Sequence, residues 1–159
     1  MTQSERKIET VQEVNMLFER FDFKTVRDVL ERGGGDQIQR EIPEVSEYFF
    51  ARIDPAIKVE FCTEQALAEG SEFPSGQSWI EMWRSWLAAF DTYEVEAGNY
   101  EAVGDQVIAD VVNRGIGRAS GLEIVMRQAQ LWSFRGSRLA RLRVYDRLEQ
   151  AREAAEAER

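Results

Sequence analysis

The chain has 159 residues, enough to bury about two thirds of the surface that its unfolded form exposes, so one domain without a stabilising disulfide or metal is expected. Its 20 Lys and Arg stand against 29 Asp and Glu, and the net charge of -9 repels a phosphate backbone, which argues against nucleic acid as a partner. The sequence has no histidine and one cysteine, Cys62, which excludes imidazole acid–base chemistry, Ser/His and Cys/His pairs, the usual zinc and iron sites, and an internal disulfide.

No apolar stretch approaches the length of a membrane span, and the N-terminal sequence MTQSERKIET lacks the apolar centre of a signal peptide. We therefore expect a cytoplasmic protein whose partners include neither a membrane nor nucleic acid. Cys62 stands in the apolar run VEFC, where a small buried side chain is expected. No pattern in the sequence indicates a metal ion or another cofactor.

The first third of the chain predicts helices. Residues 4–21 place apolar side chains at helical spacing with charges between them. Residues 24–32 form a second helical run, which we expect to end at the glycines 33–35 and to be followed by a linker. Pro43 suits the first turn of another helix, which is expected to stop before Asp54.

An extended segment and an aromatic helix follow. Residues 57–63 alternate as a strand does, with Phe61 and Thr63 on the same side. Ser75 and Gly76 introduce a helix whose aromatic and apolar stripe predicts both core and pocket wall: Trp79, Met82, Trp83, Trp86, Leu87 and Phe90.

The remainder predicts an antiparallel meander and a terminal helix. Its strand-like runs are separated by turn residues and cover 93–103, 107–118, 122–134 and 138–145. The tail DRLEQAREAAEAER reads as a charged helix with little apolar face, which we expect to fray. Helices followed by such a meander predict an α+β fold, and Gly98, Gly104, Gly115 and Gly117 are positions where the long strands can bend around a cavity.

Four stretches carry a similarity to a known family: IDPAIKVEF, GQSWIEMWRSWLAAFDTYEVE, GDQVIADVVNRGIGRASG and AQLWSFRGSRLARLRVYDR. From about residue 11 to residue 147, except around 36–42, the chain resembles the SnoaL-like branch of the nuclear-transport-factor-2-like superfamily. The resemblance implies a single domain over 1–159: a cone-shaped, curved antiparallel sheet capped by N-terminal helices (a cystatin-like α+β roll), with an inserted segment around 33–44 and a charged C-terminal helix over 146–159. It also implies a homodimer and an apolar pocket. Polyketide cyclases, ketosteroid isomerase, limonene epoxide hydrolase, scytalone dehydratase and non-enzymatic binding modules share this fold, so the fold does not fix the function.

Two glutamines mark the expected pocket. In the ketosteroid isomerase pattern, an acid that donates a hydrogen bond stands two residues before an aromatic residue in the penultimate strand, and Gln130 before Trp132 matches that place. Strand alternation then turns Met126, Gln128, Gln130 and Trp132 into the cone. A buried amide must be hydrogen-bonded, so these glutamines bind either a ligand or each other and tyrosine hydroxyls, unless the strand faces the other way.

The acidic residues of the related enzymes have no counterparts. The oxyanion tyrosine and the base of the isomerase pattern fall near Val14 and Thr63, and the aspartate of SnoaL-type cyclases falls near Val144. Asp146 shares the inward parity of the last strand and is the candidate catalytic proton carrier, although an aspartate at that place can also cap the terminal helix. Asp110 is a second candidate whose parity stays open because both faces of its strand are apolar.

The outer face of the sheet offers a candidate dimer contact. Residues of mixed apolar and arginine character alternate onto it, with a solvated face as the alternative: Arg127, Ala129, Leu131, Leu139, Arg141, Arg143 and Tyr145.

Two functions fit the sequence. The first is binding of a small apolar, oxygen-bearing molecule in the cone pocket. This function includes the case of a cyclase- or isomerase-like enzyme that lacks the usual catalytic carboxylates. Its pocket walls are Phe18, Tyr48, Phe61, Trp83, Trp86, Tyr93 and Trp132, with Gln128, Gln130 and Thr63 orienting the ligand and Asp146 carrying a proton. The second is a non-catalytic dimeric interaction module whose tryptophans fill the cone.

Overall fold

The computed structural model describes residues 1–64, 72–73 and 76–159. In chain order the helices are α1 (Gln3–Asn15), α2 (Leu17–Arg20), α3 (Phe23–Glu41), α4 (Pro43–Arg52), α6 (Gly76–Ala88) and α7 (Leu148–Ala157). The strands are β1 (Ile53–Phe61), β2 (Glu72–Phe73), β3 (Phe90–Val103), β4 (Gln106–Gly117), β5 (Glu123–Arg135) and β6 (Arg138–Tyr145). Ser75, expected to introduce the aromatic helix, lies outside the described residues.

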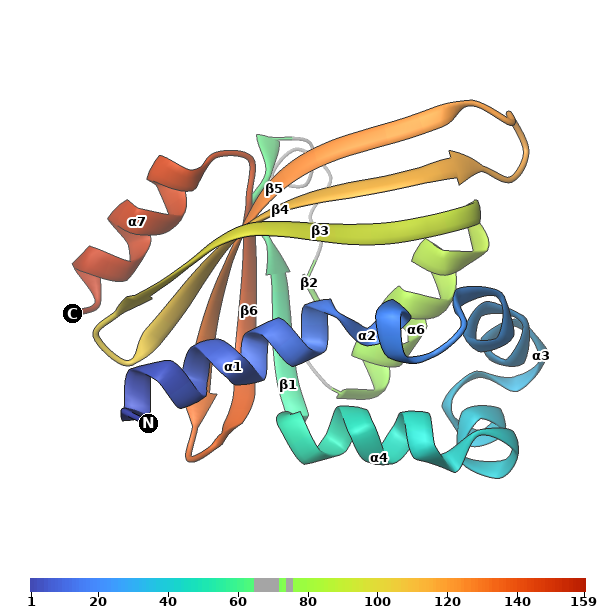
Figure 1. The fold of residues 1–159 in the computed structure, drawn as a ribbon, viewed down its shortest axis with the longest axis horizontal. Helices are drawn as coiled ribbons and strands as arrows, with labels where there is room; N and C mark the ends of the chain where they lie inside the picture. The colour runs from blue at the N-terminus through green and yellow to red at the C-terminus, as the bar shows by residue number, and fades with distance from the viewer. Residues whose placement is uncertain (65–71, 74–75) are drawn as a thin grey trace.

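The sheet has the order β2-β1-β6-β5-β4-β3 and forms the expected curved α+β cone (Figure 1). Strands β3 to β6 pair as the expected antiparallel meander, whereas β1 runs parallel to β6. The pairing of β3 with β4 shifts between Ala97 and Asn99, so Gly98 forms a bulge where a bend was expected.

The first expected helix is divided in two. A capping box of Thr2 and Glu5 starts α1, which ends before Met16, and α2 follows directly. The break buries Leu17 and places Phe18 against the rings of Trp83 and Tyr93. A single straight helix over 4–21 is therefore wrong, and the break brings α2 to the mouth of the sheet.

The expected linker after the glycines is helical. Gly33 and Gly34 interrupt the helical geometry, with a φ of 63° at Gly34, but α3 resumes and continues to Glu41. Ile38 in the resumed part is buried. The glycines kink this helix instead of ending it, because burial of Ile38 stabilises the turns that follow.

The C-terminal helix packs on the outer face of the sheet, so the expectation that it has little apolar face is wrong. Ala151 is 0% exposed and lies in a core cluster with Ile108 and Leu131. Figure 1 shows α7 on the side of the sheet opposite α1. Because alanine side chains are small, the helix can approach the strands closely. An apolar face made of alanines is hard to recognise in the sequence, since alanine is a weak indicator of a buried position.

The position of α7 also shows that part of the expected dimer surface is covered by the chain itself. Ala129, Leu131 and Arg143 lie beneath α7, and the guanidinium of Arg143 binds both carboxylate oxygens of Glu158, at 2.9 Å for the Nη2–Oε2 pair. These positions contact the chain's own helix, and the homodimer stays a prediction. Leu139, expected on the outer face, packs in the inner core because the β5–β6 register shifts after Ser133.

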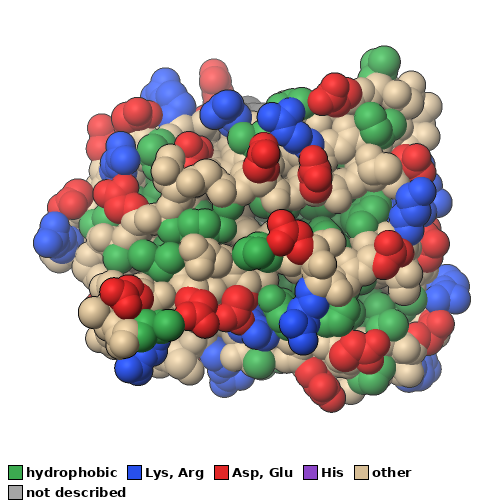
Figure 2. All heavy atoms as spheres, viewed as in Figure 1, with side chains coloured by type: hydrophobic (Ala, Val, Ile, Leu, Met, Phe, Trp, Pro, Cys, Tyr) green, Lys and Arg blue, Asp and Glu red, His purple; other side chains and the backbone are tan. Residues whose placement is uncertain are grey.

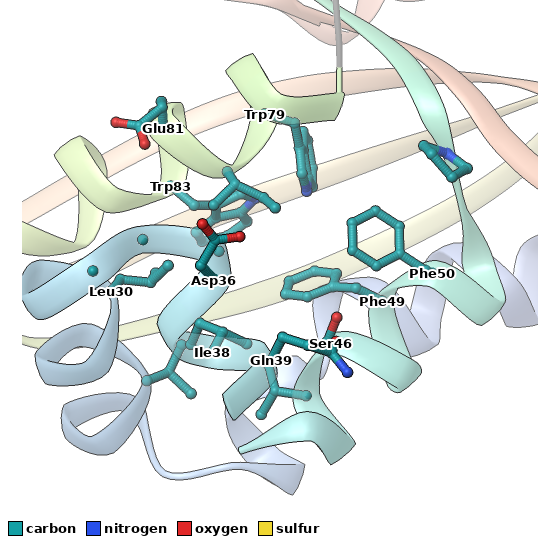
Figure 3. A pocket seen from close by; sticks show the side chains of 17 residues that line it. Leu30, Asp36, Ile38, Gln39, Ser46, Phe49, Phe50, Trp79, Glu81 and Trp83 are labelled. Atoms are coloured by element: carbon teal, nitrogen blue, oxygen red, sulfur yellow. The ribbon is translucent and has the colours of Figure 1, made fainter. Parts of the chain in front are cut away.

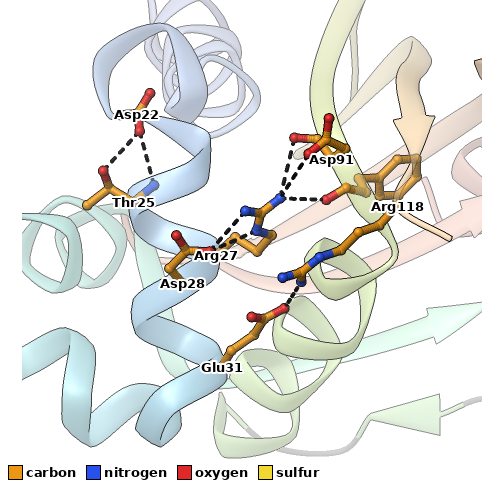
Figure 4. A network of polar contacts seen from close by, with 8 residues as sticks. Asp22, Thr25, Arg27, Asp28, Glu31, Asp91 and Arg118 are labelled. Atoms are coloured by element: carbon orange, nitrogen blue, oxygen red, sulfur yellow. Dashed lines mark hydrogen bonds and ion pairs between the residues drawn. The ribbon is translucent and has the colours of Figure 1, made fainter. Parts of the chain in front are cut away.

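A buried arginine fastens the kinked helix to the sheet. Arg27 donates to the backbone carbonyl of Phe90 at 2.9 Å and pairs with Asp28 at 3.0 Å (Figure 4). Arg118 pairs with Glu31 one helical turn further along α3. These contacts hold α3 beside the start of β3, where it covers the open end of the cone.

Acidic and basic side chains are interspersed on the face shown in Figure 2, with apolar side chains between them. No helix among the described segments is long and apolar enough to cross a membrane.

Candidate functional site

A hollow of about 90 Å³ lies inside the cone, between the helices and the inner face of the sheet. Its walls are mostly aromatic and aliphatic, and its amide side chains come from one helix and two neighbouring strands. The lining residues include Asn15 of α1, Trp83 and Trp86 of α6, Asn113 of β4, and Gln130 of β5.

The two glutamines of β5 do face the hollow. The Gln130 oxygen Oε1 accepts hydrogen bonds from Asn15 Nδ2 and Trp132 Nε1, both at 2.9 Å. The Gln128 oxygen Oε1 accepts from Asn113 Nδ2 at 3.0 Å, and the Tyr93 hydroxyl donates to Asn113 Oδ1 at 2.5 Å. The strip therefore extends from α1 through β5 and β4 to β3, and each of its amide oxygens named here accepts at least one hydrogen bond from the protein itself.

These hydrogen bonds fix which amide atoms remain available. Because an indole nitrogen only donates, Gln130 must turn its oxygen to Trp132 and its NH₂ group to the hollow. Neither the Gln130 nor the Gln128 NH₂ group has a hydrogen-bond partner among the described residues. The buried indole nitrogen of Trp83 also has no partner within the described part of the chain. The hollow thus presents amide donors, and of the two glutamine oxygens the one of Gln128, which accepts a single hydrogen bond, can accept another.

Most of the expected wall residues line this hollow. They are Phe18, Phe61, Trp83, Trp86, Tyr93, Gln128, Gln130 and Trp132. Trp132 is 1% exposed and packs edge-on against Trp79 at a centroid distance of 6.3 Å.

Tyr48 lies elsewhere, because its neighbour Phe49 is the α4 residue that packs against Trp79 and Trp83. Successive helical residues are about 100° apart, so Tyr48 turns toward α1. Its hydroxyl donates to the carbonyl of Glu13 at 2.7 Å, and its ring lies under the Arg52 guanidinium.

Thr63 and Asp146 also lie outside the described lining of the hollow. Strand β1 ends at Phe61, so alternation no longer directs Thr63 inward. Asp146 is exposed at the end of β6, where its Oδ2 accepts the backbone N–H of Glu64 at 2.7 Å. The N-cap of α7 is Arg147, so the alternative role of Asp146 as the cap is wrong.

The described lining of the hollow contains no carboxylate. Its one ionisable side chain is Tyr93, whose pKa is raised by burial, so the phenol is neutral at ordinary pH. Val14, Gln130 and Val144, which match acidic or phenolic residues of related enzymes, do line the hollow. Three of these positions thus carry neutral side chains, whereas Thr63, which matches the base of the isomerase pattern, lies outside the described lining.

Sequence reasoning missed Asn15 and Asn113, which complete the polar strip. The parity of β4 could not be assigned from the sequence because α7 buries its outer face as well, so apolar residues occupy both faces. Val111 lies in the inner core and Ile108 beneath α7, which turns Asn113 inward and Asp110 outward. Asp110 is thus removed from the candidate site.

Comparisons with solved structures agree with this architecture. A SnoaL-like polyketide cyclase from Jannaschia sp. CCS1 superimposes with a TM-score of 0.66 at 14% identity, over 99% of this chain and 96% of that chain. An NTF2-like protein of unknown function from Burkholderia pseudomallei K96243 gives 0.62 at 12% identity, over 98% and 97%. TerC, co-crystallised with polyporic acid, gives 0.58 at 13% identity, over 95% and 98%.

No protein-family model matches the sequence, and no curated protein matches it either. The chain therefore has the fold of SnoaL-like and NTF2-like proteins, as its sequence predicted, while the low identities leave the chemistry of its site to be argued from its own residues.

Proposed function

We propose that the protein binds a small apolar molecule through a ketone or similar oxygen that enters the cone. The observation that carries this proposal is that Gln128 and Gln130, both half-buried, line an apolar hollow while their NH₂ groups have no hydrogen-bond partner among the described residues. Amide donors in such surroundings favour a ligand that supplies an acceptor. The indole nitrogen of Trp83, which lines the same hollow, is buried without a partner among the described residues, and an unmet donor of that kind costs about 1–3 kcal/mol.

The size of the hollow limits what enters it. At about 90 Å³ it is smaller than the pockets of about 300–1,000 Å³ that enclose drug-sized ligands. The oxygen-bearing end of a ligand therefore enters first, and a larger body requires the half-buried rings of Trp83 and Trp86 to move apart.

Binding without acid–base catalysis is the function this lining favours. A proton-transfer enzyme needs an ionisable group within hydrogen-bond reach of its substrate, and the described lining offers only the neutral phenol of Tyr93. Asp146 acts as a proton carrier only on a substrate that extends beyond the cone.

The test uses Gln128→Glu and Gln130→Glu, which keep an acceptor oxygen for the protein's own donors and remove the NH₂ groups. Thermal unfolding is measured with cyclopentanone, cyclohexanone and acetophenone, and with the matching hydrocarbons cyclopentane, cyclohexane and ethylbenzene. We expect a ketone, more than its hydrocarbon, to raise the Tm of the native protein, and either variant to lose that difference. Gln3→Glu, an exposed change of equal charge, should keep it. Equal responses of native protein and both variants would refute the proposal, as would no response to any ketone.

A further inference from the structure

A second, larger hollow of about 500 Å³ lies between α3, α4 and α6, outside the cone (Figure 3). This volume falls within the range of small-molecule pockets. Trp79 and Trp83 line both hollows, so their indole rings form the wall that separates the outer pocket from the cone. Nothing in the binding proposed for the cone uses this outer pocket.

The outer pocket has aromatic walls. Figure 3 shows Phe49 and Phe50 of α4 facing the side of the pocket formed by Trp79 and Trp83 of α6. The faces of such rings carry partial negative charge and attract cations, most strongly where water is excluded.

The charged side chains of this pocket are both acidic. They are Asp36 and Glu81, and no Lys or Arg is found among the described lining residues. Asp36 is exposed and has no hydrogen bond or ion pair with any described residue, and Figure 3 shows its carboxylate at the pocket, between α3 and α6. Glu81 has a partner in Arg84 at 3.7 Å, but both side chains are largely exposed, so this pair neutralises Glu81 only weakly.

The kink of α3 holds Asp36 at the pocket. Gly34 has φ 63° and ψ -146°, a combination that is essentially restricted to glycine. At Gly35 an added Cβ would lie 3.0 Å from the Cδ1 atom of Ile80, so a larger residue there would require the Ile80 side chain to shift. The glycine at position 34 therefore permits the backbone geometry that places the Asp36 carboxylate at the pocket.

We propose that this outer pocket binds a small molecule that carries a protonated amine on an aromatic body. The rings of Phe49, Trp79 and Trp83 accommodate the body, and Asp36 accepts a charge-assisted hydrogen bond from the ammonium group. The net charge of -9 raises the local concentration of such cations. The ligand class differs from that proposed for the cone, where amide N–H groups donate to the ligand.

The test compares three probes of similar size at pH 7: 2-phenylethylamine, which is protonated, 2-phenylethanol, which is neutral, and 3-phenylpropionate, which is anionic. Binding is measured by calorimetry on the full chain. We expect the amine to bind about two- to fivefold more tightly than the alcohol, as an ion pair with the exposed Asp36 carboxylate provides, and the acid to bind most weakly. Asp36→Asn should remove this preference for the amine and leave alcohol affinity unchanged.

A matched control locates the effect. Asp105→Asn removes the same charge from a carboxylate whose side chain is 99% exposed in the β3–β4 turn, and it should leave amine affinity unchanged. Equal affinity for amine and alcohol in the native protein, or full amine affinity in Asp36→Asn, would overturn the proposal. An equal loss of amine affinity in Asp36→Asn and Asp105→Asn would overturn it as well, because it would assign the effect to net charge.

Discussion

The side-chain oxygen of Gln130 accepts hydrogen bonds from two donors, the Trp132 indole and the Asn15 amide, and Asn15 also hydrogen-bonds to Tyr100. In Gln130→Leu the Trp132 indole loses its described acceptor, and the Asn15 amide loses one of its partners. We expect this variant to lose about 1–3 kcal/mol of unfolding free energy, measured by urea denaturation followed by tryptophan fluorescence. Gln128→Leu, which removes the acceptor of Asn113 alone, should lose less. Equal urea midpoints for Gln130→Leu and the native protein would contradict this reading of the strip.

Strand alternation extended to Gln128 the inward direction that the family resemblance gave Gln130, one of two orientations that the sequence left open. It failed for Asn113, since β4 is buried on both faces and alternation in the sequence disappears. Tyr48 shows a similar limit in a helix: with Phe49 beside it, two adjacent aromatic residues compete for one inward position. Such choices are decided by packing partners far away in the chain.

At the scale of elements, α7 gives the sharpest stability test. Ala151 is fully buried between α7 and the outer face of the sheet. In Ala151→Lys a long cationic side chain replaces a methyl group in a site with no room for it. We expect this variant to lose about 2–4 kcal/mol of unfolding free energy and the amides of α7 to exchange hydrogen rapidly.

A matched control is available on the same helix. Ala157→Lys places the same side chain on an exposed position, so its stability and its hydrogen exchange should match the native protein. If Ala151→Lys also retained slow exchange in α7, the packing of this helix on the sheet would have to be weaker than its buried alanines indicate.

The sequence was sufficient to locate α7 and the second helical run, but not to predict how α7 packs or where the second run ends. In α7 the apolar face consists of alanines, which bury well only because the sheet beneath offers Ile108 and Leu131. In α3 three glycines normally end a helix, yet burial of Ile38 makes the turns beyond them favourable. In both cases burial against another element of the fold outweighed the local conformational preference of the residues.

At the scale of the whole molecule, the tryptophans of α6 divide the interior. The stripe that includes Trp79 and Trp83 was expected to be both core and pocket wall, and it is both: these rings close the top of the cone and form the floor of the outer pocket. The cone could be predicted because its strands and turns are long and regular. The outer pocket could not, since it depends on the direction in which α3 continues after Gly34.

Burial of all four tyrosines makes the stability of the molecule sensitive to alkaline pH. Desolvation raises the pKa of Tyr48, Tyr93, Tyr100 and Tyr145 in the folded protein. In the unfolded chain tyrosines ionise near pH 10, so above that pH the unfolded state releases protons that the folded state retains. The unfolding free energy should therefore be fully maintained below pH about 10 and fall as the pH rises through the folded-state pKa values.

Urea denaturation from pH 8 to 11 measures this fall in unfolding free energy, and absorbance at 295 nm shows whether tyrosinate appears only on unfolding. Tyr93→Phe removes one of these groups and should make the decline shallower, whereas a decline of unchanged slope would show that this phenol does not couple folding to protons.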